Sequence, residues 1–305
     1  MECCIVSCVL TIGLPLVAFV AWLKLVDADL TLLFKSKFGR SLDTLKGKVI
    51  WITGSSSGIG ECLAYELSKV GACLALSGTN TENLNKVKEN CLAIGRNNGV
   101  EVLVVPFNIC DFECHEEQLK KVLGRYGKLD ILVNNAGRSI RAAFEEIPLQ
   151  VDKELLDVNL LGPVCLTRTV VKYFKKVQYG HVVVMSSTAG KIGVPFTATY
   201  TASKHALQGY FECLRLESVI LGGLDVTLIC PGPVCSNIRE RAFTAILGQT
   251  YNRKDTPQSK RMETDRCAHL AAVAIANKMD EVWIAQNPFL LDVYLAQYTP
   301  SIFRK

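Results

Sequence analysis

The sequence predicts an α/β fold in which a doubly wound parallel sheet forms a single domain. From Lys48 onward, apolar runs of about four to eight residues alternate with longer amphipathic stretches, as expected for parallel strands buried on both faces between helices. A glycine-rich turn follows the first apolar run. The 305 residues would suffice for two domains, but no linker divides them into halves.

The expected elements alternate along the chain. Strands are predicted at Val49–Thr53, Cys73–Ser77, Val100–Phe107, Leu129–Asn134, His181–Ser186, Val226–Cys230 and Val282–Ala285. Helices are predicted between them at Ile59–Val70, Glu82–Ile94, Glu113–Tyr126, Val151–Val177, Tyr200–Ile220 and Thr264–Asn277. Because crossovers between parallel strands are right-handed, about seven such strands favour the extended Rossmann-like arrangement that binds dinucleotides.

An uncharged apolar stretch precedes this domain. Residues 3–23 contain no charged side chain, and a helix of about 21 residues spans roughly 30 Å, the hydrocarbon thickness of a bilayer. We therefore expect residues 1–26 to form an N-terminal anchor in membrane lipid. The alternatives are a buried helix of the domain and a cleavable signal peptide, although a basic n-region and a small-residue cleavage site are missing.

Basic residues after the apolar stretch predict its orientation. No lysine or arginine precedes the stretch, whereas four follow it: Lys24, Lys35, Lys37 and Arg40. The positive-inside rule then places the large domain on the cytosolic side. Unpaired cysteines and the absence of Asn-x-Ser/Thr sequons agree with this orientation. A luminal domain stays open as the alternative.

Composition argues against several classes of function. The net charge of +5 is small and its lysines and arginines are scattered, so we expect no nucleic-acid surface. The thirteen cysteines are odd in number and mostly fall singly inside apolar elements, where reduced cysteine packs as a small hydrophobe. Since there is no Cys-x-x-Cys pair and no histidine ligand spacing, we expect neither disulfides nor a metal site.

The glycine-rich turn lies where the first strand becomes a helix. Glycines there permit a tight turn, a close approach of the backbone to a pyrophosphate and close helix–strand packing, while the helix N-terminus faces the anion. A plain serine- and glycine-containing connection is the alternative. The strand–turn–helix context favours dinucleotide binding by Thr53, Gly54, Ser56, Ser57, Gly58, Ile59 and Gly60.

The end of the second predicted strand bears on the choice of cofactor. An acidic residue there commonly holds the 2′-hydroxyl of NAD, but residues 76–80 carry no carboxylate. A 2′-phosphate would meet no repulsion at this place, so NADP(H) is favoured. NAD(H) is not excluded, because no lysine or arginine stands there or at Ser57 to bind that phosphate.

A second group of polar residues offers acid–base chemistry. A predicted strand ends at Ser187, and Tyr200 follows thirteen residues later, with Lys204 one helical turn beyond. A nearby ammonium lowers the pKa of a phenol from about 10 towards the working range, so Tyr200 is the expected proton donor or acceptor. Ser187 would hydrogen-bond the substrate oxygen and stabilise its developing charge.

The Tyr-x-x-x-Lys pattern alone is not specific, because Tyr65 and Lys69 share it. That pair lies in the helix after the glycine turn, with no strand-ending serine at the same distance upstream. We interpret Tyr65 as an aromatic residue packed on its helix and Lys69 as a surface lysine.

Further residues complete a recognisable set of motifs. Besides the glycine turn and the Ser187–Tyr200–Lys204 group, the set contains the run Asn134–Gly137, then Asn159, then Pro231 and Gly232. Together these motifs resemble the short-chain dehydrogenase/reductase family across residues 46–285. The resemblance implies an NAD(P)-dependent oxidoreductase that interconverts carbonyl and alcohol groups by hydride transfer.

The resemblance also implies roles for single residues. Asn159 would hold a water that relays protons towards Lys204, and Lys204 would also bind the ribose hydroxyls. Other cofactor contacts are implied for Asn135, Ala136, Gly137, Tyr200, Pro231, Gly232, Val234 and Ser236. Asn108 replaces the aspartate that usually touches the adenine, which would weaken that contact.

Residues 29–33, 230–238, 281–285 and 288–291 carry a finer likeness. They resemble the membrane-anchored dehydrogenase/reductase member seven branch of the family. This branch implies an endoplasmic-reticulum membrane enzyme that reduces steroid, retinoid or xenobiotic carbonyls, and hence a small hydrophobic carbonyl or alcohol substrate. A membrane-tethered scaffold that binds cofactor with little turnover is the alternative function.

Two segments are expected near the substrate. Residues 239–258 would cover it, and the apolar Ala242, Phe243, Ile246 and Leu247 suit a hydrophobic ligand or, equally, a helix face that shields the core. The tail, residues 286–305, is rich in apolar side chains. It would close the pocket, touch a membrane, or pack between the subunits of a homodimer.

Overall fold

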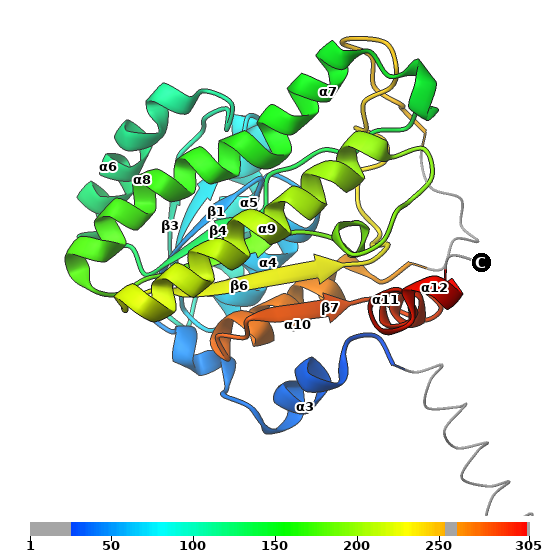
Figure 1. Cartoon of the computed structure of the whole chain (residues 1–305). Helices are drawn as coiled ribbons and strands as arrows, with labels where there is room; N and C mark the ends of the chain where they lie inside the picture. The colour runs from blue at the N-terminus through cyan, green and yellow to red at the C-terminus, as the bar shows by residue number, and fades with distance from the viewer. Residues whose placement is uncertain (1–25, 254–260, 304–305) are drawn as a thin grey trace, which may run out of the picture.

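A sheet of seven parallel strands organises the molecule (Figure 1). The computed structural model describes residues 26–253 and 261–303. The strands lie in the order β3-β2-β1-β4-β5-β6-β7, which confirms the predicted doubly wound arrangement. Their bounds are β1 Val49–Thr53, β2 Cys73–Ser77, β3 Glu101–Val104, β4 Ile131–Asn134, β5 His181–Met185, β6 Asp225–Pro231 and β7 Glu281–Ile284.

The strand order reverses between β1 and β4. From β1 the chain first builds outward through β2 and β3, then returns to add β4 to β7 on the other side. Parallel pairing aligns Thr53 with Ser77 and Asn134 with Val184, so the carboxyl ends of the strands share one edge of the sheet. In open α/β sheets, ligands bind outside this edge at the point of reversal.

Helices cover both faces of the sheet (Figure 1). Side chains alternate along each strand, so that in β1 Ile50 and Ile52 enter one core whereas Val49 and Trp51 enter the other. The first core is covered by α4 (Gly58–Lys69), α5 (Thr81–Ile94) and α10 (Thr264–Ala276). The second is covered by α6 (His115–Tyr126), α8 (Gly162–Val177) and α9 (Ala198–Leu221).

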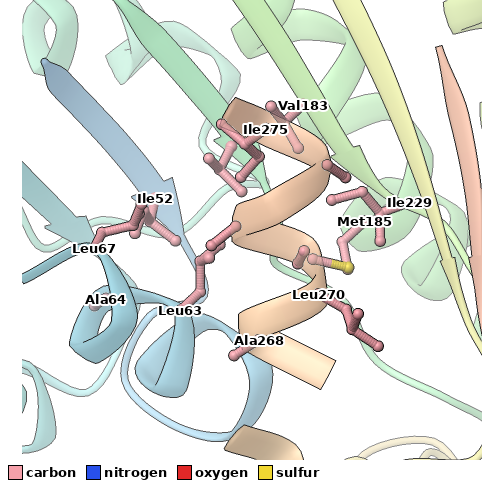
Figure 2. Packing of buried hydrophobic residues seen from close by; sticks show 14 of the residues in the cluster. Ile52, Leu63, Ala64, Leu67, Val183, Met185, Ile229, Ala268, Leu270 and Ile275 are labelled. Atoms are coloured by element: carbon pink, nitrogen blue, oxygen red, sulfur yellow. The ribbon is translucent and has the colours of Figure 1, made fainter. Parts of the chain in front are cut away.

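Small residues in α10 give the first core its close packing. Ala268 and Ala271 of this helix are fully buried, and Figure 2 shows α10 between Leu63 of α4 and Met185 of β5. Because alanine allows close approach of neighbouring helices, α4 is held firmly against the sheet. The N-terminus of α4, where the glycine turn ends, therefore has a fixed position at the carboxyl edge of β1.

The helix predicted over Val151–Val177 is wrong in one respect, because it is interrupted. α7 (Leu149–Leu156) ends in a widened π-helical turn, Asp157–Leu161, before α8 begins. Gly162 explains the position of this turn, since a Cβ there would lie 2.7 Å from Cγ1 of Ile109, and the following Pro163 has no N–H for a regular helix. The widened turn contains Asn159.

Both ends of the described chain hold helices that the sequence analysis did not predict: α3 (Leu30–Phe38), α11 (Phe289–Tyr298) and α12 (Pro300–Phe303). Asp29 fixes α3, because its carboxylate accepts hydrogen bonds from Leu32 N (2.9 Å) and Trp283 N (2.8 Å). The predicted anchor falls almost wholly outside the described residues. Within the described ranges, no helix has both the length and the apolar character to cross a bilayer.

Candidate active site

A cleft of about 660 Å³ opens at the carboxyl edge of the sheet, where the strand order reverses. The ends of β1, β4, β5 and β6 form its floor. Two of the predicted site residues, Gly60 and Asn159, lie behind its wall. All others line it: Thr53, Gly54, Ser56, Ser57, Gly58, Ile59, Asn108, Asn135, Ala136, Gly137, Ser187, Tyr200, Lys204, Pro231, Gly232, Val234 and Ser236.

The glycine turn adopts a backbone that favours glycine at two positions. Gly54 and Gly58 have φ angles of +64° and +63°, in the left-handed region that L side chains rarely occupy. A Cβ on Gly54 would also lie 2.7 Å from Cα of Ala136. The turn thus passes directly against the segment that follows β4 and leaves its own backbone bare towards the cleft.

The run after β4 holds this turn in place. Asn135 Nδ2 donates to the carbonyl oxygens of Thr53 (2.9 Å) and Gly54 (3.0 Å). In return, Thr53 Oγ1 accepts from the backbone N–H groups of Asn135 (3.0 Å) and Ala136 (3.1 Å). Four hydrogen bonds therefore join two segments that the sequence separates by about 80 residues, and they fix the floor of the cleft.

Gly60 places the first helix close behind the turn. A Cβ there would lie 2.4 Å from Asn135 Nδ2 and 2.6 Å from the carbonyl oxygen of Gly54, so only glycine fits. The N-terminus of α4 consequently points into the cleft, where unpaired backbone N–H groups and the helix dipole favour an anion. These residues fit the pyrophosphate of a dinucleotide.

Ser187 and Tyr200 meet on the other side of the cleft floor. Ser187 follows β5, where its Oγ donates to Pro231 O (3.2 Å) and accepts from Ala189 N (3.1 Å). Tyr200 lies in the first turn of α9, in the same cleft as Ser187. Burial raises the pKa of Tyr200, while the neighbouring Ser187 hydroxyl and the charge of Arg141 act against that rise.

Lys204 lies one turn along α9 and is buried. Its Nζ donates to Met185 O (2.9 Å) and lies 5.6 Å from the centre of the Tyr200 ring. Burial lowers the pKa of Lys204 to about 8. The expectation that its ammonium brings the pKa of Tyr200 below the usual value is therefore wrong for the cofactor-free protein, because loss of hydration is the stronger effect at both groups.

Asn159 supports the cleft from behind. In the widened turn, its Oδ1 accepts from Arg138 N (2.8 Å), and its Nδ2 donates to Arg138 O (2.8 Å) and Ser203 Oγ (3.0 Å). The side chain thus ties the segment after β4 to α9. A Cβ on Gly137 would lie 3.3 Å from Asn159 Oδ1 and 3.7 Å from Lys204 Nζ, so the bare glycine leaves space between these two groups.

The second Tyr-x-x-x-Lys pair has a different environment. Tyr65 donates to Glu61 Oε1 (2.7 Å) and accepts from Asn90 (3.0 Å) on the outer side of α4, and burial raises its pKa to about 12. Lys69 forms an ion pair with Glu66. Neither residue lines the cleft, in agreement with the structural interpretation of this pair.

The segment after β6 completes the cleft and returns to the glycine turn. Gly232 N donates to Ile284 O (2.8 Å) and Val234 bridges to Met262. A Cβ on Gly58 would lie 3.4 Å from Cβ of Ser236, so this serine faces the start of α4. On the far side, Asn108 is exposed, and its Oδ1 accepts from Cys110 N (3.1 Å).

The loop of residues 239–253 differs from expectation. Ala242 is fully buried, Phe243 packs under the Arg138 guanidinium at 4.2 Å, and Ile246 and Leu247 are more than half exposed to solvent. None of these four apolar residues lines the cleft. The expected apolar cover over the substrate is therefore wrong for them; the predicted segment's last part, residues 254–258, lies outside the described residues.

Arginines line the cleft instead, and the sequence analysis missed them. Arg241 Nη1 lies 3.3 Å from Ser57 Oγ in the glycine turn, and Arg138 donates to Arg241 O through Nε (3.1 Å) and Nη2 (2.6 Å). The local sequence has no basic residue at Ser57, but the fold brings Arg241 to it from 184 positions further along the chain. Arg138 directly follows the Asn134–Gly137 run and Arg141 comes three positions later, a signal that would have found them.

Three expectations concern the tail, metals and cysteines. The described tail residues do not line the cleft; Leu290 and Tyr294 of α11 instead pack with Trp283. The described residues contain no group of three or more His, Cys, Asp or Glu side chains with metal-site geometry. The buried cysteines among them, Cys91, Cys230 and Cys267, are free thiols, and burial raises the pKa of Cys230 and Cys267 to about 12.

Comparison with known proteins agrees with these features. The family model described as short chain dehydrogenase matches residues 48–246. Human dehydrogenase/reductase SDR family member 7 is 43% identical over 276 residues, which cover 90% of this chain and 81% of the human protein. Bovine dehydrogenase/reductase SDR family member 7B is 35% identical and covers 85% of this chain and 80% of its own length.

Solved structures share the fold. An alcohol dehydrogenase from the archaeon Thermococcus sibiricus, complexed with 5-hydroxy-NADP, matches with a TM-score of 0.68 at 25% identity, covering 79% of this chain and 97% of its own. A short-chain dehydrogenase/reductase from Burkholderia phymatum, in complex with NAD, has a TM-score of 0.73 at 24% identity, covering 86% and 97%. The resemblance drawn from the motifs is confirmed: the chain belongs to the short-chain dehydrogenase/reductase family and is an NAD(P)-dependent oxidoreductase.

Proposed function

We propose that this oxidoreductase interconverts carbonyl and alcohol groups on small substrates, with Tyr200 donating or accepting the proton. One observation carries the proposal. Tyr200, Ser187 and Lys204 line the same cleft as the glycine turn, close enough for Ser187 to influence the pKa of Tyr200, with Lys204 Nζ 5.6 Å from the centre of the Tyr200 ring. A substrate oxygen placed between the two hydroxyls would receive hydrogen bonds from both.

The protonated state of Tyr200 favours reduction of a carbonyl group to an alcohol. A bound reduced nicotinamide supplies a hydride to the carbonyl carbon. The Ser187 hydroxyl, which now donates to Pro231 O, can turn to the carbonyl oxygen because its O–H rotates freely. Tyr200 then transfers its phenolic proton to that oxygen, and the raised pKa of Tyr200 keeps this proton available at neutral pH.

Lys204 and Asn159 would restore the proton to Tyr200. With a pKa of about 8, the Lys204 ammonium is largely charged at neutral pH. Its Nζ lies 5.6 Å from the centre of the Tyr200 ring and would stabilise the phenolate. The space left by Gly137 between Lys204 Nζ and Asn159 Oδ1 suits a water molecule. Such a water would carry the replacing proton to Lys204 and from there to Tyr200.

NADP(H) is the proposed cofactor. Residues at the end of β2, Gly78 and Thr79, line the cleft without a carboxylate, so a 2′-phosphate meets no repulsion. The Arg241 guanidinium, 3.3 Å from Ser57 Oγ, supplies the positive charge that the local sequence lacks. We expect Arg241→Ala to weaken NADP(H) binding at least about ten-fold and NAD(H) binding much less. Equal binding of both cofactors to the wild-type protein would contradict this preference.

The substrate class is proposed from the cleft wall, and the membrane anchor from the N-terminal sequence. Val158, Val194 and Ile238 give the cleft apolar wall, which supports an apolar carbonyl compound of the steroid, retinoid or xenobiotic kind. The uncharged stretch of residues 3–23 supports an anchor in the endoplasmic-reticulum membrane with the enzyme domain on its cytosolic side. Resistance of the intact protein to alkaline carbonate extraction is the expected result for the anchor.

The reaction class is tested by incubating the protein with NADPH and a panel of steroid ketones, retinal and aromatic dicarbonyl compounds. We expect NADPH consumption to match the alcohol formed, mole for mole, with at least one of them. Tight cofactor binding without turnover of any panel member would instead support the scaffold alternative.

A further inference from the structure

The described residues that line the cleft include no aspartate or glutamate. Four arginines and one lysine are among them: Arg138, Arg141, Arg241, Arg261 and Lys204. The α4 N-terminus and Arg241 already face the place proposed for the cofactor phosphates. Arg141 and Lys204, the two cations related to Tyr200, have no part in that phosphate site.

Arg141 is the cleft arginine whose charge acts on Tyr200. It follows Ile140, which is fully buried and packs in one cluster with Tyr200. A backbone hydrogen bond from Arg141 N to Phe243 O (2.9 Å) fixes its main chain. Its charge lies close enough to oppose the rise in the pKa of Tyr200. A ligand held by Arg141 would therefore occupy the same end of the cleft as the reacting oxygen.

The Arg141 guanidinium has few partners of its own. Its one hydrogen bond among the described residues runs from Nη1 to the adjacent Ile140 O at 3.4 Å, and no described carboxylate lies within ion-pair distance of it. Burial, followed by the charges of Arg239 and Arg261, lowers the pKa of Arg141. A guanidinium has five N–H donors, and leaving a half-buried one without an anion is costly.

We propose that Arg141 binds a carboxylate on the substrate, so that the enzyme acts on carbonyl compounds, or the matching alcohols, that carry an acidic group. The planar guanidinium presents paired donors that fit the two oxygens of a carboxylate. This inference rests on the proposed carbonyl–alcohol chemistry and narrows its substrate class: the apolar wall takes the body of the molecule and Arg141 its acidic end.

Binding to the complex with oxidised cofactor tests the site without turnover. The full-length protein loaded with NADP⁺ cannot reduce an aldehyde, so affinity is measured alone, by titration calorimetry. The probes are 4-formylbenzoate and the nearly isosteric, neutral 4-formylbenzamide. We expect the acid to bind roughly ten-fold more tightly than the amide, since a hydrogen-bonded charge pair contributes about that factor.

Three variants assign the effect to Arg141. Arg141→Gln should bring the two affinities within about two-fold of each other, and Arg141→Lys should keep only part of the preference, because it keeps the charge but loses the paired donors. Arg125→Gln is the matched control, since Arg125 lies on α6 and pairs with Glu101; its preference should equal that of the wild type. Equal affinities for acid and amide in the wild type, or a preference that survives Arg141→Gln, would overturn the proposal.

Turnover with NADPH separates this inference from the reaction itself. If the acid binds preferentially but neither aldehyde is reduced, the carboxylate site stands and the proposed reaction fails. If both are reduced with equal kcat/KM and bind equally, the reaction stands and the carboxylate site fails. We expect the enzyme to reduce both aldehydes, and the acid to have the lower KM at similar kcat.

Discussion

Thr53 offers a direct test of how the cleft floor is held. Its Oγ1 accepts from two backbone N–H groups, those of Asn135 at 3.0 Å and Ala136 at 3.1 Å. Thr53→Val keeps the side-chain shape but removes this acceptor. A partly buried N–H left without a partner costs about 1 kcal/mol, the lower end of the range for such groups, so we expect the free energy of unfolding to fall by roughly 2 kcal/mol and cofactor affinity to fall with it.

Thr53→Ser is the matched control. It keeps the hydroxyl and loses one methyl group, a loss of about 1 kcal/mol. Urea unfolding followed through the fluorescence of the fully buried Trp51 on β1 measures both variants, with midpoints compared at equal slope. The reasoning would be refuted if the valine variant were as stable as the serine variant, or if both bound cofactor like the wild type.

Two further predictions concern packing and pH. Gly60→Ala should lower cofactor affinity at least about ten-fold, because its methyl group would lie 2.4 Å from Asn135 Nδ2. Gly124→Ala is the contrasting case, because a Cβ there would meet no atom within 4 Å apart from the backbone of its own helix. It should stabilise α6 by about 0.5–1 kcal/mol in urea unfolding. The pKa of Lys204 is about 8 in the folded protein against 10.5 as its reference. Between these values the unfolded chain binds more protons, so Lys204's contribution makes the cofactor-free protein more stable as pH rises. Unfolding titrations should show this rise as a difference from Lys204→Met; a difference that stays constant with pH would contradict it.

The fold was predictable because its signals are local. Each buried strand reads as a short apolar run, and the glycine turn marks the end of β1. The interrupted helix shows the limit: Pro163 signals a disturbance, but the place of the π-helical turn depends on Gly162 packing against Ile109. That contact joins residues more than 50 positions apart, and no periodicity reveals it.

Some features of the candidate site follow from local sequence, and others depend on tertiary contacts. Ser187, Tyr200 and Lys204 were predictable because spacing along one strand and one helix brings them together. The direction of the pKa shift at Tyr200 was not, because it depends on burial, which outweighs the neighbouring charges. Arg241 reaches Ser57 across 184 positions, so the basic residue that the local sequence lacks at the glycine turn is supplied by tertiary structure.

The most direct test of the account is the proton transfer assigned to Tyr200. Tyr200→Phe removes only the phenolic hydroxyl, and we expect kcat for carbonyl reduction to fall by about 10²–10⁴-fold while NADP(H) affinity changes little. Tyr65→Phe, at the second Tyr-x-x-x-Lys pair on the outer side of α4, should leave kcat unchanged. Wild-type turnover in Tyr200→Phe would contradict the account.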